Sequence, residues 1–438
     1  MKSGKLILKI QSEKGQNFQQ EQGFMDRPNY LSQLIRKKRN GMIKVVTGVR
    51  RCGKSYLLFD LFYTYLLKNG VPNDHIIQLA LDDRANKNYR DPDKLYQFVT
   101  QRITDTSPYY ILLDEVQLVP EFEDVLNSFL HIRNTDTYVT GSNAKFLSKD
   151  IITEFRGRGD QIHLYPLSFS EFMSAFQGEK HDGWQQYIAY GGLPKIMEME
   201  NEADKMNYLR NIFDETYIKD ILERNDIRNQ AEMEELLDIV ASNIGGLTNP
   251  KKLSDSFKSI KNVSIHPDTI KNYLGYLEDA FLISMAKRYD VKGKKYISTP
   301  MKYYFVDMGL RNARLNFRQI EETHLMENVI YNELCIRGYN VDVGNIDYRF
   351  INSEGKQQQK QMEIDFVCNR GFSRCYIQSA FSMPTLEKEE QEQKSLITVN
   401  DSFKKVIIVK DGITHYNERG ILILNLFDFL LNTNSLEL

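Results

Sequence analysis

Eight residues in the first part of the chain have the types and the spacing that bind a nucleoside triphosphate. A glycine, four residues and then Gly-Lys-Ser run from Gly48 to Ser55, without a mismatch to the phosphate-binding pattern. Glycines let backbone N–H groups curl around phosphates, and a following helix directs its positive end at them. Lys54 would reach the β- and γ-phosphates, and the Ser55 hydroxyl would hold Mg²⁺. The predicted nucleotide-binding residues here are Gly48, Val49, Arg50, Arg51, Cys52, Gly53, Lys54, Ser55 and Tyr56.

Two acids follow an apolar run further along the chain, in the stretch YYILLDE that ends with Asp114 and Glu115. An acid at the end of such a strand can orient the water of a bound metal ion, and its neighbour can activate the attacking water. The pattern therefore predicts Asp114 as the Mg²⁺ partner and Glu115 as the general base. The alternative is a strand that ends in two solvated acids.

The elements that must position these residues alternate between strands and helices. Apolar runs predict strands within 42–48, 75–83, 109–117, 137–143 and 160–168, with helical patterns between them. The unbroken apolar run at 109–113 suits a parallel strand that is covered on both faces. We therefore expect an α/β fold with a parallel sheet in the first ~170 residues.

Length and composition limit the classes of protein. The chain has 438 residues, of which 41% are hydrophobic and 26% charged, so several globular domains are expected. No stretch approaches the ~18–20 apolar residues that cross a bilayer, and the N-terminal apolar run is too short for a secretory signal. The four cysteines show no metal-binding spacing. We expect a cytoplasmic protein without a membrane partner.

Five stretches occur in a characteristic order: TGVRRCGKS, YYILLDEVQ, TYVTGSNAKFL, EFRGRGDQIHLYPLSFSEF and YGGLPKI. The set resembles the AAA-type ATPases of bacteria and archaea, in the branch near the origin-recognition and STAND NTPases. More narrowly, the chain resembles prokaryotic AAA proteins with an uncharacterised C-terminal restriction-endonuclease-like domain. The resemblance covers about residue 29 to the end and is stronger in the first half. It implies a P-loop NTPase fold, with ATP and Mg²⁺ as cofactors.

The resemblance also implies roles for residues outside the phosphate loop. Ser142 and Asn143 match a polar sensor of the γ-phosphate, although a simple turn would have the same sequence. Arg156 and Arg158 match a finger that stabilises charge on the transferred phosphoryl group, or else form an ordinary basic loop. Pro194, in Gly-Leu-Pro, matches a motif that packs on adenine, or else marks a helix-breaking turn.

The region 246–318 has the order of elements of a winged helix: two helices, then a hairpin with its turn near 290–293. Residues 251–318 contain fourteen Lys and Arg against six Asp and Glu, an excess of +8. This predicts contact with DNA phosphates, with a protein-contact module as the alternative. The basic residues of the hairpin are Lys287, Arg288, Lys292, Lys294 and Lys295.

The last part of the chain suggests an incomplete nuclease site. A PD-(D/E)xK nuclease places a helix glutamate, a strand aspartate and an acid-x-lysine pair around Mg²⁺. Glu327 and Asp365 match the first two positions, but Gln378 stands for the second acid and Ala380 for the lysine. Lys360 or Lys388 could supply the ammonium from a shifted place. Alternatively, Glu363 and Asp365 are acids on a solvated strand edge, and the site is degenerate.

Together these observations predict five segments: a flexible arm (1–28), a P-loop ATPase core (29–170), a helical lid (171–245), a winged-helix-like unit (246–318) and a restriction-endonuclease-like domain (319–438). The function predicted first is an ATP-driven switch that acts on DNA or on a DNA-associated partner. An ATP-gated nuclease and a protein-directed signalling ATPase are the alternatives. An arginine finger that acts between subunits would require a homo-oligomer.

Overall fold

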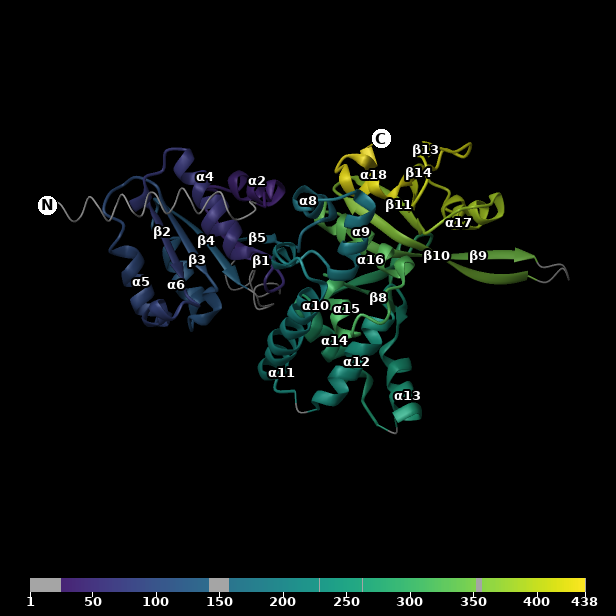
Figure 1. Ribbon diagram of the computed structural model, residues 1–438, viewed down its shortest axis with the longest axis horizontal. Coiled ribbons are helices and arrows are strands. Elements are labelled where there is room, and N and C mark those ends of the chain that lie inside the picture. The colour runs from purple at the N-terminus through teal and green to yellow at the C-terminus, as the bar shows by residue number, and fades with distance from the viewer. Residues whose placement is uncertain (1–24, 142–156, 228, 262, 352–356, 438) are drawn as a thin grey trace.

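Two sheets organise the chain, with helices packed on and between them (Figure 1). The computed structural model describes residues 25–141, 157–227, 229–261, 263–351 and 357–437, and the statements below concern those residues. None of the described helices is long and apolar enough to cross a membrane. The α/β fold class and the parallel first sheet are confirmed.

The first sheet has five parallel strands in the order β2-β3-β4-β1-β5. Every residue of β1 and β3 is buried, as expected where helices cover both faces. The strands are β1 (Ile43–Thr47), β2 (Ile76–Ala80), β3 (Tyr109–Asp114), β4 (Thr135–Gly141) and β5 (Gly159–His163). The helices are α2 (Pro28–Arg36), α3 (Lys54–Tyr56), α4 (Tyr63–Lys68), α5 (Pro92–Thr100) and α6 (Phe122–Phe129), and a π-helical segment, Leu57–Phe62, joins α3 to α4.

A largely helical region follows the first sheet and lies beside and below the second sheet in the view of Figure 1. Its first helix is fixed by a capping box, in which Ser168 and Glu171 bond reciprocally to backbone N–H groups. The helices are α8 (Phe169–Ala175), α9 (Lys180–Tyr190), α10 (Glu202–Asn211), α11 (Lys219–Arg224), α12 (Gln230–Ser242), α13 (Pro250–Lys261), α14 (Pro267–Asp279) and α15 (Met308–Arg314).

The second sheet is mixed and has nine strands in the order β13-β14-β12-β11-β10-β9-β7-β8-β6. Its strands are β6 (Leu247–Thr248), β7 (Ile283–Asp290), β8 (Lys295–Phe305), β9 (Asn340–Ile351), β10 (Gln357–Arg370), β11 (Ser373–Ala380), β12 (Lys404–Val409), β13 (His415–Tyr416) and β14 (Leu422–Asn425). The helices α16 (Glu322–Ile336), α17 (Leu386–Thr398) and α18 (Leu426–Leu431) belong to the same part of the chain. In Figure 1 the β9–β10 hairpin projects beyond the rest of this sheet.

The hairpin predicted as a wing forms, but it is not a separate module. Strand β7 pairs in parallel with β9, and β8 pairs with β6, so both strands are continuous with the C-terminal sheet. Arg288, predicted among the DNA-contacting residues, is buried and donates to Asn345 Oδ1 at 2.5 Å. The predicted domain boundary at residue 318 therefore separates strands that belong to the same sheet.

Candidate functional site

The phosphate-binding loop connects β1 to α3 and has the backbone conformation that the sequence predicts. Gly48 has φ 145°, and a Cβ there would lie 2.1 Å from the carbonyl oxygen of Leu164. Gly53 has φ 100° and directly precedes the helix. These two positions require glycine, the first for space and the second for a left-handed turn.

Lys54 is buried and folds its ammonium back onto the loop. Its Nζ donates to the carbonyl oxygens of Gly48, at 3.0 Å, and Val49, at 3.1 Å. The loop and its neighbours line a pocket of about 580 Å³, together with Asp82, Glu115 and Gln117. The ammonium thus lies in the wall of a pocket large enough for part of a nucleotide.

Ser55 and Asp114 lie together, as the sequence predicts for a Mg²⁺ site. The Ser55 hydroxyl donates to Asp114 Oδ2 at 2.7 Å, and the Thr140 hydroxyl donates to the other carboxylate oxygen. Burial raises the pKa of Asp114, whereas the hydrogen bonds from Thr140 and Ser55 lower it. A hydroxyl and a buried carboxylate at this distance fit a divalent metal ion held with bound phosphates.

Glu115 adopts a left-handed conformation, with φ 52°, directly after β3. Its backbone N–H donates to the Thr140 hydroxyl at 3.0 Å, and its carboxylate accepts from Gln117 Nε2. Glu115 lines the pocket beside the loop, where a general base would have to lie. Sequence reasoning missed Thr140, Gln117 and Asp82, although Thr140 lies near the carboxyl end of β4 and Asp82 just after that of β2, the two parallel strands that flank β3.

The other predicted ATPase residues have different outcomes. Ser142, Asn143 and Arg156 lie outside the described residues, so their roles stay predictions. Arg158 is exposed, and its carbonyl oxygen accepts from Ile43 N at 2.9 Å; it is not among the described residues that line the pocket. Pro194 lies against the loop, since a Cβ on Gly53 would be 3.8 Å from Pro194 Cγ.

Arg50 connects the phosphate loop to the helical region. Its guanidinium donates to Asp220 Oδ1 of α11 at 2.9 Å, and Asp220 Oδ2 also pairs with Arg224. All three side chains are partly exposed, so the pair contributes little to stability. The pair matters because it connects the phosphate loop to α11, a helix of the predicted lid.

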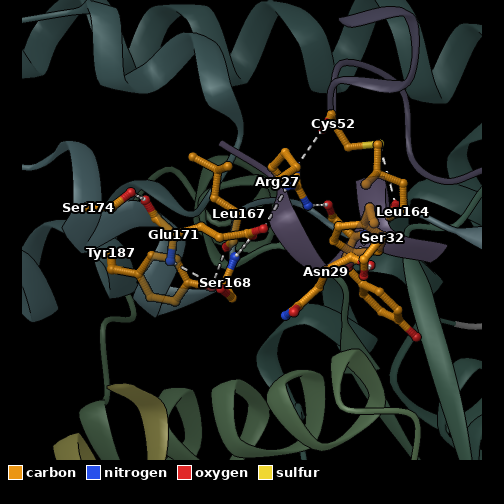
Figure 2. Close-up of polar contacts among 12 residues, drawn as sticks. Arg27, Asn29, Ser32, Cys52, Leu164, Leu167, Ser168, Glu171, Ser174 and Tyr187 are labelled. Carbon is orange, nitrogen blue, oxygen red and sulfur yellow. Dashed lines mark hydrogen bonds and ion pairs between the residues drawn. The ribbon is translucent and has the colours of Figure 1, made fainter. Parts of the chain in front are cut away.

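Arg27 forms a second connection, and a buried one (Figure 2). Its Nε donates to Glu171 Oε1 at 2.9 Å, and the other guanidinium nitrogens donate to the carbonyl oxygens of Cys52, at 3.2 Å, and Tyr165, at 2.8 Å. Sequence reasoning placed Arg27 in a flexible arm, but it is only 3% exposed and directly precedes α2. Residues 1–24 of that arm lie outside the described residues.

We expect Arg27→Lys to destabilise the fold by about 1–3 kcal/mol, although the charge is kept. A single ammonium cannot reproduce the forked guanidinium, whose three nitrogens donate to three acceptors, so at least one buried carbonyl oxygen loses its donor. Urea denaturation compares the variant with wild type, and Arg36→Lys at the end of α2 serves as the control. A loss no larger than that of the control would show that the fork is dispensable.

The C-terminal carboxylates gather around a lysine that sequence reasoning missed. Lys302 Nζ of β8 lies 3.0 Å from Glu327 Oε1, 2.8 Å from Glu363 Oε1 and 3.9 Å from Asp365 Oδ1. The Tyr304 hydroxyl also donates to Glu327 Oε1, at 2.7 Å. Lys302 is 4% exposed, so its charge is balanced inside the protein. Glu327 and Asp365 thus lie in one cluster, as predicted, and the ammonium comes from neither Lys360 nor Lys388.

The other predicted members of this site lie on β11, next to Asp365. Ser379 N donates to Asp365 Oδ2 at 2.8 Å, and Gln378 Oε1 accepts from Ser395 at 3.4 Å. Ala380 is buried. Lys388 pairs with Glu392 on its own helix, at 2.6 Å.

The carboxylates of this cluster stabilise the protonated form of Lys302. Burial lowers the pKa of Lys302, but the charges of Glu327, Asp365 and Glu363 outweigh that effect and raise it above its usual value. Burial and the charge of Glu327 raise the pKa of Asp365, whereas the charge of Lys302 lowers it. The Lys302 ammonium lies closer to the carboxylates of the two glutamates than to that of Asp365.

These residues do not fit the metal ion that a nuclease site would need. The Lys302 ammonium lies among the carboxylates that would have to bind the ion. Across the described ranges, no group of three or more His, Cys, Asp or Glu side chains is arranged to hold a metal. No cleavage chemistry can be derived from this arrangement.

Comparison with known proteins is consistent with the pocket described above. Residues 40–173 match the family model of an AAA domain, and residues 181–321 match a domain of unknown function (DUF8612). The chain is 33% identical over 413 residues to an uncharacterized protein of Haemophilus influenzae, covering 93% of this chain and 98% of that protein. It is 27% identical over 394 residues to the uncharacterized protein MJ1544 of Methanocaldococcus jannaschii, covering 86% and 83%.

Solved structures show more distant likenesses. The Aeropyrum pernix ORC1 protein in complex with DNA is 10% identical, with 67% of this chain and 93% of that chain covered, at a TM-score of 0.28. AMPPCP-bound DnaA from Aquifex aeolicus is 14% identical, with 59% and 89% covered, at a TM-score of 0.28.

Proposed function

The chain belongs to the family of the Haemophilus influenzae protein and carries an AAA domain in its first part, and we propose that it is a Mg²⁺-dependent ATPase that acts as a nucleotide-driven switch. One observation carries this proposal. Lys54 and Ser55 at the start of α3 and Glu115 just after β3 line a single pocket, and Asp114 at the end of β3 accepts from Ser55. That set provides a phosphate clamp, a metal site and a base.

The chain's own groups have separate tasks in hydrolysis. Lys54 exchanges its contacts with loop carbonyls for phosphate oxygens, and the backbone N–H groups of the loop bind the remaining phosphate charge. Ser55 and Asp114 would hold Mg²⁺, which would supply positive charge to the phosphates. Glu115 accepts a proton from the attacking water, while Gln117 orients its carboxylate.

The switch depends on the connections between the loop and the helical region. Arg50 reaches Asp220, Pro194 lies against Gly53, and Arg27 joins the Cys52 carbonyl to Glu171 of α8. A nucleotide that contacts both the loop and these helices binds some of their arrangements better than others, and so shifts the population toward them. We propose that this shift is passed to the nine-stranded sheet.

We propose that the C-terminal part has a restriction-endonuclease-like fold with a degenerate site. The helix glutamate and the strand aspartate are both present, but Lys302 lies where a metal ion would be needed. The ATP-gated nuclease is therefore the less favoured function. Action on DNA is supported by the exposed lysines of the β7–β8 turn, and a protein-directed signalling ATPase is the alternative.

We expect Lys54→Ala to weaken ATP binding by about 10- to 100-fold, because a contact to a charged group contributes roughly 1.5–3 kcal/mol. Calorimetry with ATP and Mg²⁺ measures the affinity. Lys68→Ala, an exposed lysine at the end of α4, should bind ATP like wild type. Wild-type affinity in the Lys54 variant would refute the assignment of the site.

A further inference from the structure

A groove of about 710 Å³ lies at one end of the nine-stranded sheet, on elements that the ATPase pocket does not use. It is formed by the β7–β8 turn, the β10–β11 turn and the segment that leads into β12. We call it the Phe372 groove. Its lining includes Lys292, Lys294, Phe372, Arg374, Asp401 and Phe403.

The groove presents aromatic faces to solvent. Phe372 is fully exposed at the tip of the tight β10–β11 turn, next to Gly371 with φ 59°. Phe403, in the segment that leads into β12, is 40% exposed. Exposed single apolar residues are common, but two phenylalanine rings that line one groove mark a binding surface.

Arg374 lies between the aromatic rings. Its guanidinium carbon is 5.4 Å from the ring centroid of Tyr289 and 5.4 Å from that of Phe403. Its Nε donates to Asn369 Oδ1 at 2.7 Å, which fixes the plane of the group. A planar cation held among aromatic rings can stack on a base as well as attract a phosphate.

The charge of the lining is predominantly positive. Lys292, Lys294 and Arg374 face one acid, Asp401, whose carboxylate already accepts from the Tyr376 hydroxyl at 2.7 Å. A neighbouring cavity of about 770 Å³ shares Arg374 and adds Lys287, the exposed Tyr296 and one acid, Asp342, which accepts from the Tyr296 hydroxyl at 3.0 Å. Basic and aromatic side chains therefore continue from one hollow into the next.

We propose that the Phe372 groove binds single-stranded nucleic acid. Positive charge that follows a backbone, interleaved with exposed aromatic faces, is the combination that binds unpaired bases by stacking. A duplex hides the faces of its bases, and an acidic peptide would use the lysines but gain nothing from Phe372 at the tip. This inference rests on the proposed action on DNA and specifies the form of the partner.

The test uses the full chain and fluorescence anisotropy with labelled oligothymidylate, oligouridylate and a DNA duplex, each at two salt concentrations. We expect the single strands to bind more tightly than the duplex, and the two single strands show whether DNA or RNA is preferred. Phe372→Ala should weaken single-strand binding about tenfold. The double variant Lys292→Gln/Lys294→Gln should reduce the slope of log K against log salt by about 1.4, since each phosphate contact contributes ~0.7.

Two controls keep the result specific. Leu386→Ala removes another exposed apolar side chain, which lies outside the groove, and Lys87→Gln/Lys94→Gln removes two exposed lysines of the AAA domain. Each variant must still bind ATP by calorimetry, which separates failure of this inference from failure of the proposed ATPase. Equal affinity for duplex and single strand, or wild-type binding by Phe372→Ala, would overturn the proposal. Binding of an acidic peptide with the same affinity would assign the groove to a protein partner instead.

Discussion

Replacing Glu115 by glutamine should lower the rate of ATP hydrolysis by about 10²–10⁴-fold, the range that a positioned general base contributes. Glutamine keeps the size and the hydrogen-bonding ability of the side chain but cannot accept the proton of the attacking water. The carboxylate lies in the pocket wall, and its backbone N–H is fixed by the Thr140 hydroxyl at 3.0 Å. ATP affinity should change little, since the phosphate loop and the pair of Ser55 and Asp114 are unaltered.

Single-turnover hydrolysis measured beside calorimetric ATP affinity separates these two effects. Glu121→Gln is a matched control, because Glu121 is an exposed acid on the same loop with the same φ of 52°, and it is not among the described residues that line the pocket. Hydrolysis within a few-fold of wild type in the Glu115 variant would exclude Glu115 as the base. A parallel loss of affinity would instead give it a role in binding.

The ATPase core could be predicted because its signals are local. The glycines, the lysine and the serine of the loop lie within eight consecutive residues. The fully buried β3 is recognisable in the sequence as an apolar run that is followed by two acids. The carboxyl ends of parallel strands share one edge of the sheet, so the meeting of Ser55 with Asp114 followed from the fold class. The match to an AAA domain confirms the domain type of that part, while the roles of the site residues, including the sensor and the finger, stay predictions.

The remaining contacts could not be predicted, since they depend on how distant segments pack. Arg27 precedes the first helix in a stretch without a pattern, and only the folded chain brings it to Cys52 and Glu171. Lys302 was one basic residue among fourteen in a segment that suggested a surface for phosphates. It turns inward because β7 pairs with β9, which carries β8 into the C-terminal sheet, and a single sequence does not reveal that pairing.

Replacing Lys302 by methionine should lower the free energy of unfolding by about 3 kcal/mol, because the loss of one partner leaves buried charges unpaired. Methionine nearly preserves the volume, so the effect reports charge rather than a cavity. We expect the low end of the usual range, since Glu363 is 33% exposed and water can partly replace its partner. The fluorescence of Trp184, the chain's single tryptophan, follows urea unfolding; its Nε1 donates to Glu322 Oε1 of α16 at 2.6 Å.

The double variant Lys302→Met/Glu363→Gln should recover part of this loss, because it removes one of the charges left without a partner. Lys258→Met, on the exposed side of α13, controls for the substitution itself. Binding of Mn²⁺ distinguishes an ion-pair cluster from a metal site. If Lys302 is its cation, wild type binds no Mn²⁺ there, and Asp365→Asn changes no Mn²⁺ signal in electron paramagnetic resonance. Mn²⁺ binding by wild type that Asp365→Asn abolishes would show that the lysine shares the cluster with a metal ion, and would favour a nuclease as the function of the C-terminal part.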